Sequence, residues 1–150
     1  MDETKISRYL TETLAGVEAM TMPDTWFFFY NPPHLPPDHM FPFATITASN
    51  AHDQFSDLNR PGVFRLNMGV GKQTFRGLFW TPELPTPKES AEGQGAPGFD
   101  FAALDRLMPH PVYGKMYWVC VLNPSAATFE AQVKPLLAEA YQRAVSKRAQ

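Results

Sequence analysis

The clearest pattern of hydrophobic and polar positions lies between residues 64 and 70. Apolar side chains at every second position alternate there with Arg65, Asn67 and Gly69. A period of two is typical of a β-strand that has one face in the core. We therefore expect a strand over 64–70 whose apolar face is buried, with Arg65 and Asn67 projecting from the opposite, non-core face.

Three further segments are rich in residues that favour strands. Residues 25–30 form a dense aromatic run, which is typical of a strand that is covered on both faces. Residues 43–47 are bounded by Pro42 and by a polar stretch, and residues 117–122 end at an Asn-Pro-Ser turn. The sequence thus predicts four strands.

Apolar residues recur with helical spacing near both ends of the chain. Ile6, Leu10 and Leu14 predict a first helix over about 3–15. A last helix ends the chain, and it contains Pro135. Because proline cannot donate the backbone hydrogen bond of a helix interior, we expect a kink or a break just before this residue.

Two short helices are predicted between the third and fourth strands. The first covers residues 72–80. The second begins at Asp100, which is suited to cap it, and uses Phe101, Leu104 and Leu107 as its apolar side.

The order of the predicted elements is α-β-β-β-α-(α)-β-α. Three successive strands favour antiparallel pairing, so we expect an α+β fold, a two-layer sandwich whose mainly antiparallel sheet has helices packed on one face. Prolines and glycines cluster at 31–42 and 81–98, and the second cluster predicts a surface loop. We expect residues 1–150 to form a single domain.

The composition narrows the class of protein. A chain of 150 residues with 44% hydrophobic residues is long enough for one core and too short for two. Its formal net charge of −2 gives no general attraction to polyanions, and one cysteine is typical of a reducing compartment. No apolar run is long enough for a signal peptide or a membrane span. We expect a cytoplasmic protein with no membrane partner.

The sequence GVGKQT over residues 69–74 invites comparison with a phosphate-binding loop. The first glycine of GxxxxGK[ST] would fall on Leu66, and Gln73 takes the place of the Ser/Thr, so the motif is not met. A strand that passes through glycines into a helix could still hold an anion at the helix N-terminus, beside Lys72. The alternative is that the glycines only form a tight turn.

The histidines and the single cysteine form no catalytic or metal-binding pattern. His34, His39 and His52 lack the spacing of a metal site, and the cysteine lies in the last strand as a buried residue would. His110 lies between two prolines beside Tyr113. A rigid turn there could present the imidazole to a ligand, or the imidazole could only hold the turn. We predict no catalytic residue, no metal and no cofactor.

Charged residues are unevenly distributed along the chain. Residues 60–80 contain no acid but include Arg60, Arg65, Lys72 and Arg76. Together these cations could form a basic surface for a nucleic acid or a phosphorylated ligand. The alternative is that each of them is separately solvated.

Three blocks, residues 59–79, 99–125 and 129–144, strongly resemble one small bacterial family. The runs PHPVY (109–113) and WVCVLNPS (118–125) are its most specific features. The family is a domain of unknown function, numbered 6194, found chiefly in actinobacteria. The resemblance therefore implies a bacterial origin and no particular activity.

The order of elements is more distantly similar to the MmcQ/YjbR family. There a tryptophan strand such as 117–122 leads into a C-terminal helix with a pair such as Ala140-Tyr141. This resemblance implies an α-β(3)-α-β-α fold, described as a double wing, and DNA binding. The chain departs from that family at residues 110–115, which replace its basic-His-Trp approach to the last strand.

Two functions remain open. The first is a non-catalytic binding domain that offers a basic sheet face to an anionic partner. The alternative is a small-molecule-binding protein or enzyme with a pocket around His110, Tyr113 and Arg65. The candidate ligand-binding residues of the two hypotheses are Arg65, Asn67, Lys72, Arg76, His110 and Tyr113.

Overall fold

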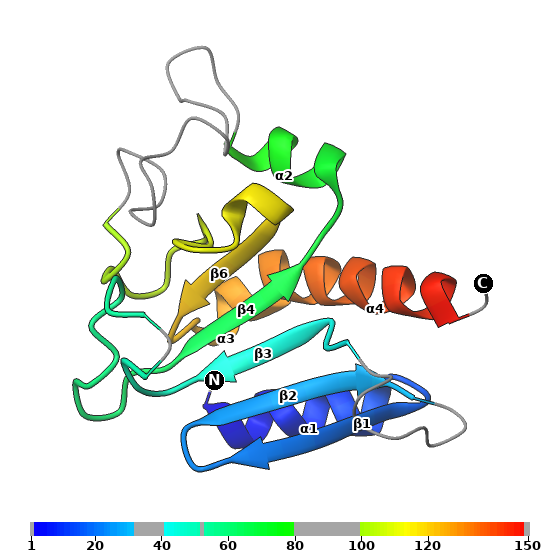
Figure 1. Cartoon of the computed structure of the whole chain (residues 1–150), viewed down its shortest axis with the longest axis horizontal. Coiled ribbons are helices and arrows are strands. Elements are labelled where there is room, and N and C mark those ends of the chain that lie inside the picture. The colour runs from blue at the N-terminus through cyan, green and yellow to red at the C-terminus, as the bar shows by residue number, and fades with distance from the viewer. Residues whose placement is uncertain (1, 32–40, 52, 80–99, 149–150) are drawn as a thin grey trace.

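Six strands pair antiparallel in one sheet within residues 2–31, 41–51, 53–79 and 100–148, the part of the chain that this computed structural model describes (Figure 1). The strand order is β1-β2-β3-β4-β6-β5. The strands are β1 Val17–Met22, β2 Thr25–Tyr30, β3 Ala44–Thr47, β4 Arg65–Gly69, β5 Met108–Pro109 and β6 Trp118–Leu122. All five pairings are antiparallel, as three successive strands predict.

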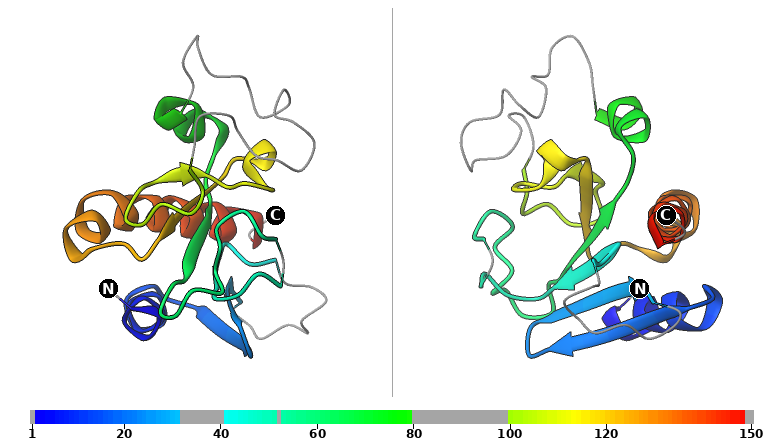
Figure 2. Two further views of the ribbon diagram at one scale, coloured as in Figure 1. Left: turned by 90° about the vertical axis from the view of Figure 1, so that its left-hand side faces the viewer. Right: turned by 45° about the vertical axis from the view of Figure 1, so that its right-hand side comes forward.

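Helices cover one face of this sheet. Figure 2 shows α1 and α4 on the same side of the strands, while α2 follows the end of β4. The α-helices are α1 Glu3–Thr13, α2 Lys72–Phe79, α3 Ala126–Thr128 and α4 Lys134–Arg148. The predicted α+β class, a two-layer sandwich with a mainly antiparallel sheet, is confirmed.

The main core lies between the sheet and these helices. Leu66 and Met68 of β4 are fully buried there, together with Leu10 of α1 and Leu137 of α4. Phe64 and Val70 flank β4 and belong to the same cluster, so every second residue of 64–70 faces the core as predicted. A one-residue slip of β4 would exchange its faces, and this burial fixes the register.

Arg65 and Asn67 do point away from the helices, as predicted, but the face from which they project is buried as well and is no open basic surface. Their exposed fractions are 1% and 2%. A second apolar cluster covers their face of the sheet: Leu58, Phe101, Met108, Cys120 and Leu122. The alternation of residues 64–70 identifies two faces, but it does not distinguish a face that meets water from one that meets a polar layer of the protein.

The sequence did not predict β1. The first helix ends at Thr13 instead of Ala15, and Gly16 adopts φ 78° in the turn that follows. β1 lies at the sheet edge, where most of its residues are partly or fully exposed, so it lacks the apolar alternation that reveals a strand.

The short helix expected after Asp100 is also wrong. Residues 100–107 form turns, and the next regular element is β5. Asp100 caps only a turn, since its Oδ1 accepts a hydrogen bond from the Ala102 N–H. Asp105 has φ 56°, a left-handed conformation that ends any helix.

The helix does not break before Pro135, but it is irregular there. Residues Phe129–Val133 form a π-helical turn, in which the Lys134 N–H donates to the Phe129 carbonyl five residues earlier. A wider turn is a known way for a helix to accommodate a residue that removes an ordinary backbone hydrogen bond.

Some expectations fall outside the described residues. The loop at 81–98 and most of the proline-rich segment 31–42 are among them. No helix within the described ranges is long and apolar enough to cross a membrane.

Truncating Leu66 to Ala should lower the free energy of unfolding by about 2–5 kcal/mol, because its fully buried side chain would leave a cavity. Leu78→Ala, on α2 with 43% exposure, is the matched control and should change it by less than about 0.5 kcal/mol. Urea denaturation measures both values. Equal effects of the two variants would contradict the placement of β4.

Candidate functional site

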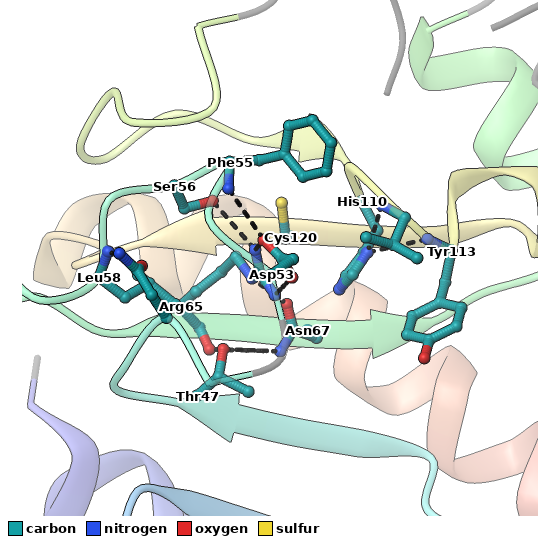
Figure 3. A network of polar contacts seen from close by, with 12 residues as sticks. Thr47, Asp53, Phe55, Ser56, Leu58, Arg65, Asn67, His110, Tyr113 and Cys120 are labelled. Carbon is teal, nitrogen blue, oxygen red and sulfur yellow. Dashed lines mark hydrogen bonds and ion pairs between the residues drawn. The ribbon is translucent and has the colours of Figure 1, made fainter. Parts of the chain in front are cut away.

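The face of the sheet opposite α1 and α4 carries a row of polar side chains. β4 places Arg65 opposite Thr47 of β3 and Leu122 of β6. One step along, Asn67 lies opposite Thr45 and Cys120. We refer to Asp53, Ser56, Arg65, Asn67 and His110 as the polar centre; Figure 3 shows these residues, which come from the sheet and from the segments that cover it.

Arg65 and Asp53 form a bidentate ion pair at the middle of the polar centre. Arg65 Nη1 lies 3.0 Å from Asp53 Oδ1, and Nη2 lies 2.8 Å from Oδ2. The two side chains are only 1% and 7% exposed. Nη1 also donates to Ser56 Oγ at 3.0 Å. This planar fork matches a carboxylate, so both charges are compensated inside the protein.

Asn67 fixes the remaining side of the guanidinium. Its Oδ1 accepts from Arg65 Nε at 2.8 Å, and its Nδ2 donates to Thr45 Oγ1 at 3.0 Å and to Thr47 Oγ1 at 3.4 Å. The amide therefore links β3 to the ion pair. Asn67 and its two threonine partners explain why polar residues occupy inward-facing positions of adjacent strands.

Local turns position the loop that carries Asp53. The Phe55 N–H donates to Asp53 Oδ1, an Asx-type turn, and the Leu58 N–H donates to Asn50 Oδ1 at 2.8 Å. Arg60 joins the loop to the next covering segment, because its Nη2 donates to the Ser56 and Ala102 carbonyls. Arg60 thus links two covering segments, although its position in the sequence suggested a cation of a basic surface.

Asp53 remains ionised in this setting. Burial alone would raise the pKa of its carboxyl, but the hydrogen bonds and the positive charge of Arg65 outweigh burial and hold the pKa below its ordinary value. Sequence analysis missed Asp53 because it lies in a polar loop, twelve residues before its partner. The one indication in the sequence was an arginine within a predicted strand, because a guanidinium that becomes buried there requires a carboxylate partner.

His110 lies in the turn after β5 and has a fixed tautomer. Its Nδ1 accepts from the N–H groups of Val112 and Tyr113 at 3.0 and 2.9 Å, so the ring proton lies on Nε2. The side chain is 4% exposed. Burial, helped by the charge of Arg65, lowers the pKa of His110 to about 3 although Asp53 acts in the opposite direction.

The strand register places the His110 imidazole on the same face of the sheet as Arg65 and Asn67. The His110 N–H donates to the Trp118 carbonyl, and Trp118 lies opposite Gly69 of β4. A Cβ at Gly69 would lie 2.9 Å from the indole, so only glycine leaves room for Trp118. His110 is therefore one step along the sheet from Asn67 and Cys120, with its ring centroid 5.0 Å from that of half-exposed Tyr113.

Cys120 does not form a nucleophile with His110. It is fully buried, and burial raises the pKa of its thiol to about 12. Its Sγ donates weakly to the Pro109 carbonyl at 3.7 Å. A thiol with this pKa is not a nucleophile at neutral pH.

The predicted cations do not form one surface. Lys72 and Arg76 are exposed on α2, whereas Arg65 is buried in its ion pair. The N-terminal end of α2 already holds a carboxylate, because Glu139 of α4 accepts from the Gly71 N–H at 2.7 Å and from Thr74 Oγ1 at 2.5 Å. The anion suited to this helix terminus is supplied by the chain itself.

The described ranges contain no group of three His, Cys, Asp or Glu side chains that could hold a metal ion. His34, His39 and His52 lie outside those ranges.

Removing the charge of Asp53 should destabilise the fold strongly. Asp53→Asn leaves the Arg65 guanidinium buried without a counter-charge, which costs about 3–5 kcal/mol. Asp57→Asn is the matched control in the same loop, because that side chain is 61% exposed beside Arg60 and its loss should cost under about 1 kcal/mol. Chemical denaturation measures the free energy of unfolding of both variants. Similar losses would show that the buried ion pair contributes no more to stability than the exposed one.

The free energy of unfolding should fall as the pH drops below about 6.5, the pKa of an unfolded histidine. Unfolded His110 then binds a proton that the folded protein excludes down to about pH 3, so stability falls by about 1.4 kcal/mol per pH unit in this window. His110→Asn retains an acceptor for the turn and should remove the part of this pH dependence that His110 contributes. Urea titrations between about pH 7 and 5 test this, and parallel profiles for the two proteins would contradict it.

Comparison with known proteins gives one match. The sequence matches a family of unknown function (DUF6194) over residues 1–150. No curated protein and no solved structure matches the chain. Arg65, Asn67 and His110 of the polar centre lie in two of the blocks that resemble this family, and Asp53 and Ser56 lie outside them. The chain belongs to the DUF6194 family.

Proposed function

We propose that this protein binds a small polar molecule at the polar centre and that His110 Nε2–H donates a hydrogen bond to it. The observation that carries the proposal is the state of this imidazole. Its Nδ1 has two donors, but its Nε2–H has no acceptor among the described residues. A buried donor without an acceptor costs about 1–3 kcal/mol, and a protein group or ligand that accepts the bond recovers that cost.

The energetic cost of the whole centre supports a functional role. A buried ion pair is often no more stabilising than apolar residues of the same volume, because both charges lose their hydration. The chain nevertheless places Arg65, Asp53 and His110 together under a sheet that elsewhere buries apolar side chains. Perturbed titratable groups gathered in this way are typical of binding and catalytic sites.

The chemistry of the centre favours binding over catalysis. His110 Nδ1 accepts two backbone hydrogen bonds, and Nε2 already carries the ring proton, so neither nitrogen is free to take a proton. Asp53 is neutralised by Arg65, and the Cys120 thiol is protonated at neutral pH. No base and nucleophile pair is therefore available here.

The geometry also favours a small molecule over a nucleic acid. A basic sheet face for an anionic polymer requires Arg65 at the surface beside Lys72 and Arg76, and Arg65 is buried. Tyr113 is 51% exposed and its ring lies beside His110, which makes it the natural contact between the surface and the imidazole.

A thermal melting screen tests the proposal, with small polar metabolites, phosphorylated metabolites and short DNA as probes. A ligand present at a hundred times its Kd stabilises the folded state by about 2.7 kcal/mol. For a chain of this size, the melting temperature should rise by about 5–10 °C.

Two variants locate the site. His110→Asn should abolish the rise, because asparagine can still accept the turn hydrogen bonds but cannot replace Nε2–H. Lys72→Ala/Arg76→Ala should retain the rise. If the double variant loses the stabilisation while His110→Asn keeps it, the ligand binds the α2 surface and the proposal is wrong.

A further inference from the structure

The hydrogen-bond donor of the polar centre is uncharged, and its direction is fixed by the backbone. Two N–H groups in the turn at residues 110–113 hold Nδ1 as an acceptor, which leaves Nε2–H as the one remaining donor of a buried ring, without an acceptor among the described residues. An imidazole held in this way cannot exchange tautomers without losing both turn bonds. It presents a neutral donor over the range of pH in which a free histidine changes charge.

The described residues around His110 carry no net charge that could attract a charged ligand. Among the described residues, the charged or titratable groups around it are Arg65 on β4, Asp53 in the covering loop, Cys120 on β6 and Tyr113 in its own turn. Arg65 and Asp53 neutralise each other, and the thiol is protonated. Arg65 donates three hydrogen bonds to Asp53 and Ser56 and a fourth to Asn67.

These conditions discriminate between classes of ligand. A carboxylate or a phosphate buried beside His110 would lose its hydration and gain no counter-charge, which is strongly unfavourable. A carbonyl oxygen needs only one donor and loses much less hydration. At a site that supplies one neutral donor, the loss of hydration therefore costs an anion more free energy than the single hydrogen bond returns.

We infer that the ligand of this site is an uncharged molecule that presents a carbonyl oxygen, as in a carboxamide, ketone or ester, to His110 Nε2–H beside the ring of Tyr113. This inference rests on the proposed function and specifies its ligand class. Because neither partner is charged, binding is insensitive to salt and remains unchanged between about pH 5 and 8.

Benzamide and benzoate test the ligand class, because they share one shape and differ in charge. NMR spectra of the imidazole ¹⁵N nuclei report on His110 directly while each probe is titrated into the full-length protein. Benzamide should shift the Nε2 resonance of His110, leave the Nδ1 resonance in its acceptor position, and bind about tenfold or more tightly than benzoate. The affinity should be the same at low and high salt.

His110→Asn should lose benzamide binding, while Lys72→Ala/Arg76→Ala should retain it. Tighter binding of benzoate, a salt-dependent affinity, or no response of His110 to benzamide would overturn the inference. If the melting screen then finds an anionic ligand whose effect is lost in His110→Asn, the proposed function stands and only the ligand class is wrong. If no ligand depends on His110, both are wrong.

Discussion

The ion pair between Arg65 and Asp53 determines how the second face of the sheet is built. A guanidinium on an inward-facing strand position has to meet a carboxylate, and the chain meets this need by folding the 53–58 segment over β4. Leu58 and Phe101 then pack around the pair and exclude water from it. Around β4 and β6, the side of the sheet without helices is therefore a covered polar layer and not an open surface.

α4 has a comparable role at the other end of β4. Glu139 caps the N-terminal end of α2, and Arg143 Nη1 donates to the Val70 carbonyl at 2.6 Å. The Tyr141 hydroxyl donates to the Ala15 carbonyl after α1. One helix thus satisfies three backbone groups at two breaks in the chain, where orphan donors and acceptors would otherwise be left.

Sequence alone predicted those elements whose local pattern coincides with their final environment. The alternation of 64–70 located β4, the aromatic run located β2, and Pro135 marked the irregular turn before α4. The exposed edge strand β1 has no such pattern, so it was missed. The site was predicted in part: His110, Arg65 and Asn67 were named. Asp53, the partner of Arg65, and Glu139, whose carboxylate occupies the N-terminal end of α2, were not named, because such pairings form only when distant segments meet.

The pairing of β4 with β6 also has a consequence for how the chain folds. β1 with β2, β2 with β3, and β5 with β6 each join strands separated by short connections, whereas β4 and β6 enclose residues 70–117, the longest segment that any described strand pair closes. Closing a long loop loses chain entropy before its contacts form, so this contact is expected to limit the folding rate. The same entropy grows only with the logarithm of loop length, by about 0.6 kcal/mol per doubling. The pairing of β4 with β6 is thus the strand contact whose stability changes least for each residue added to the segment that it encloses.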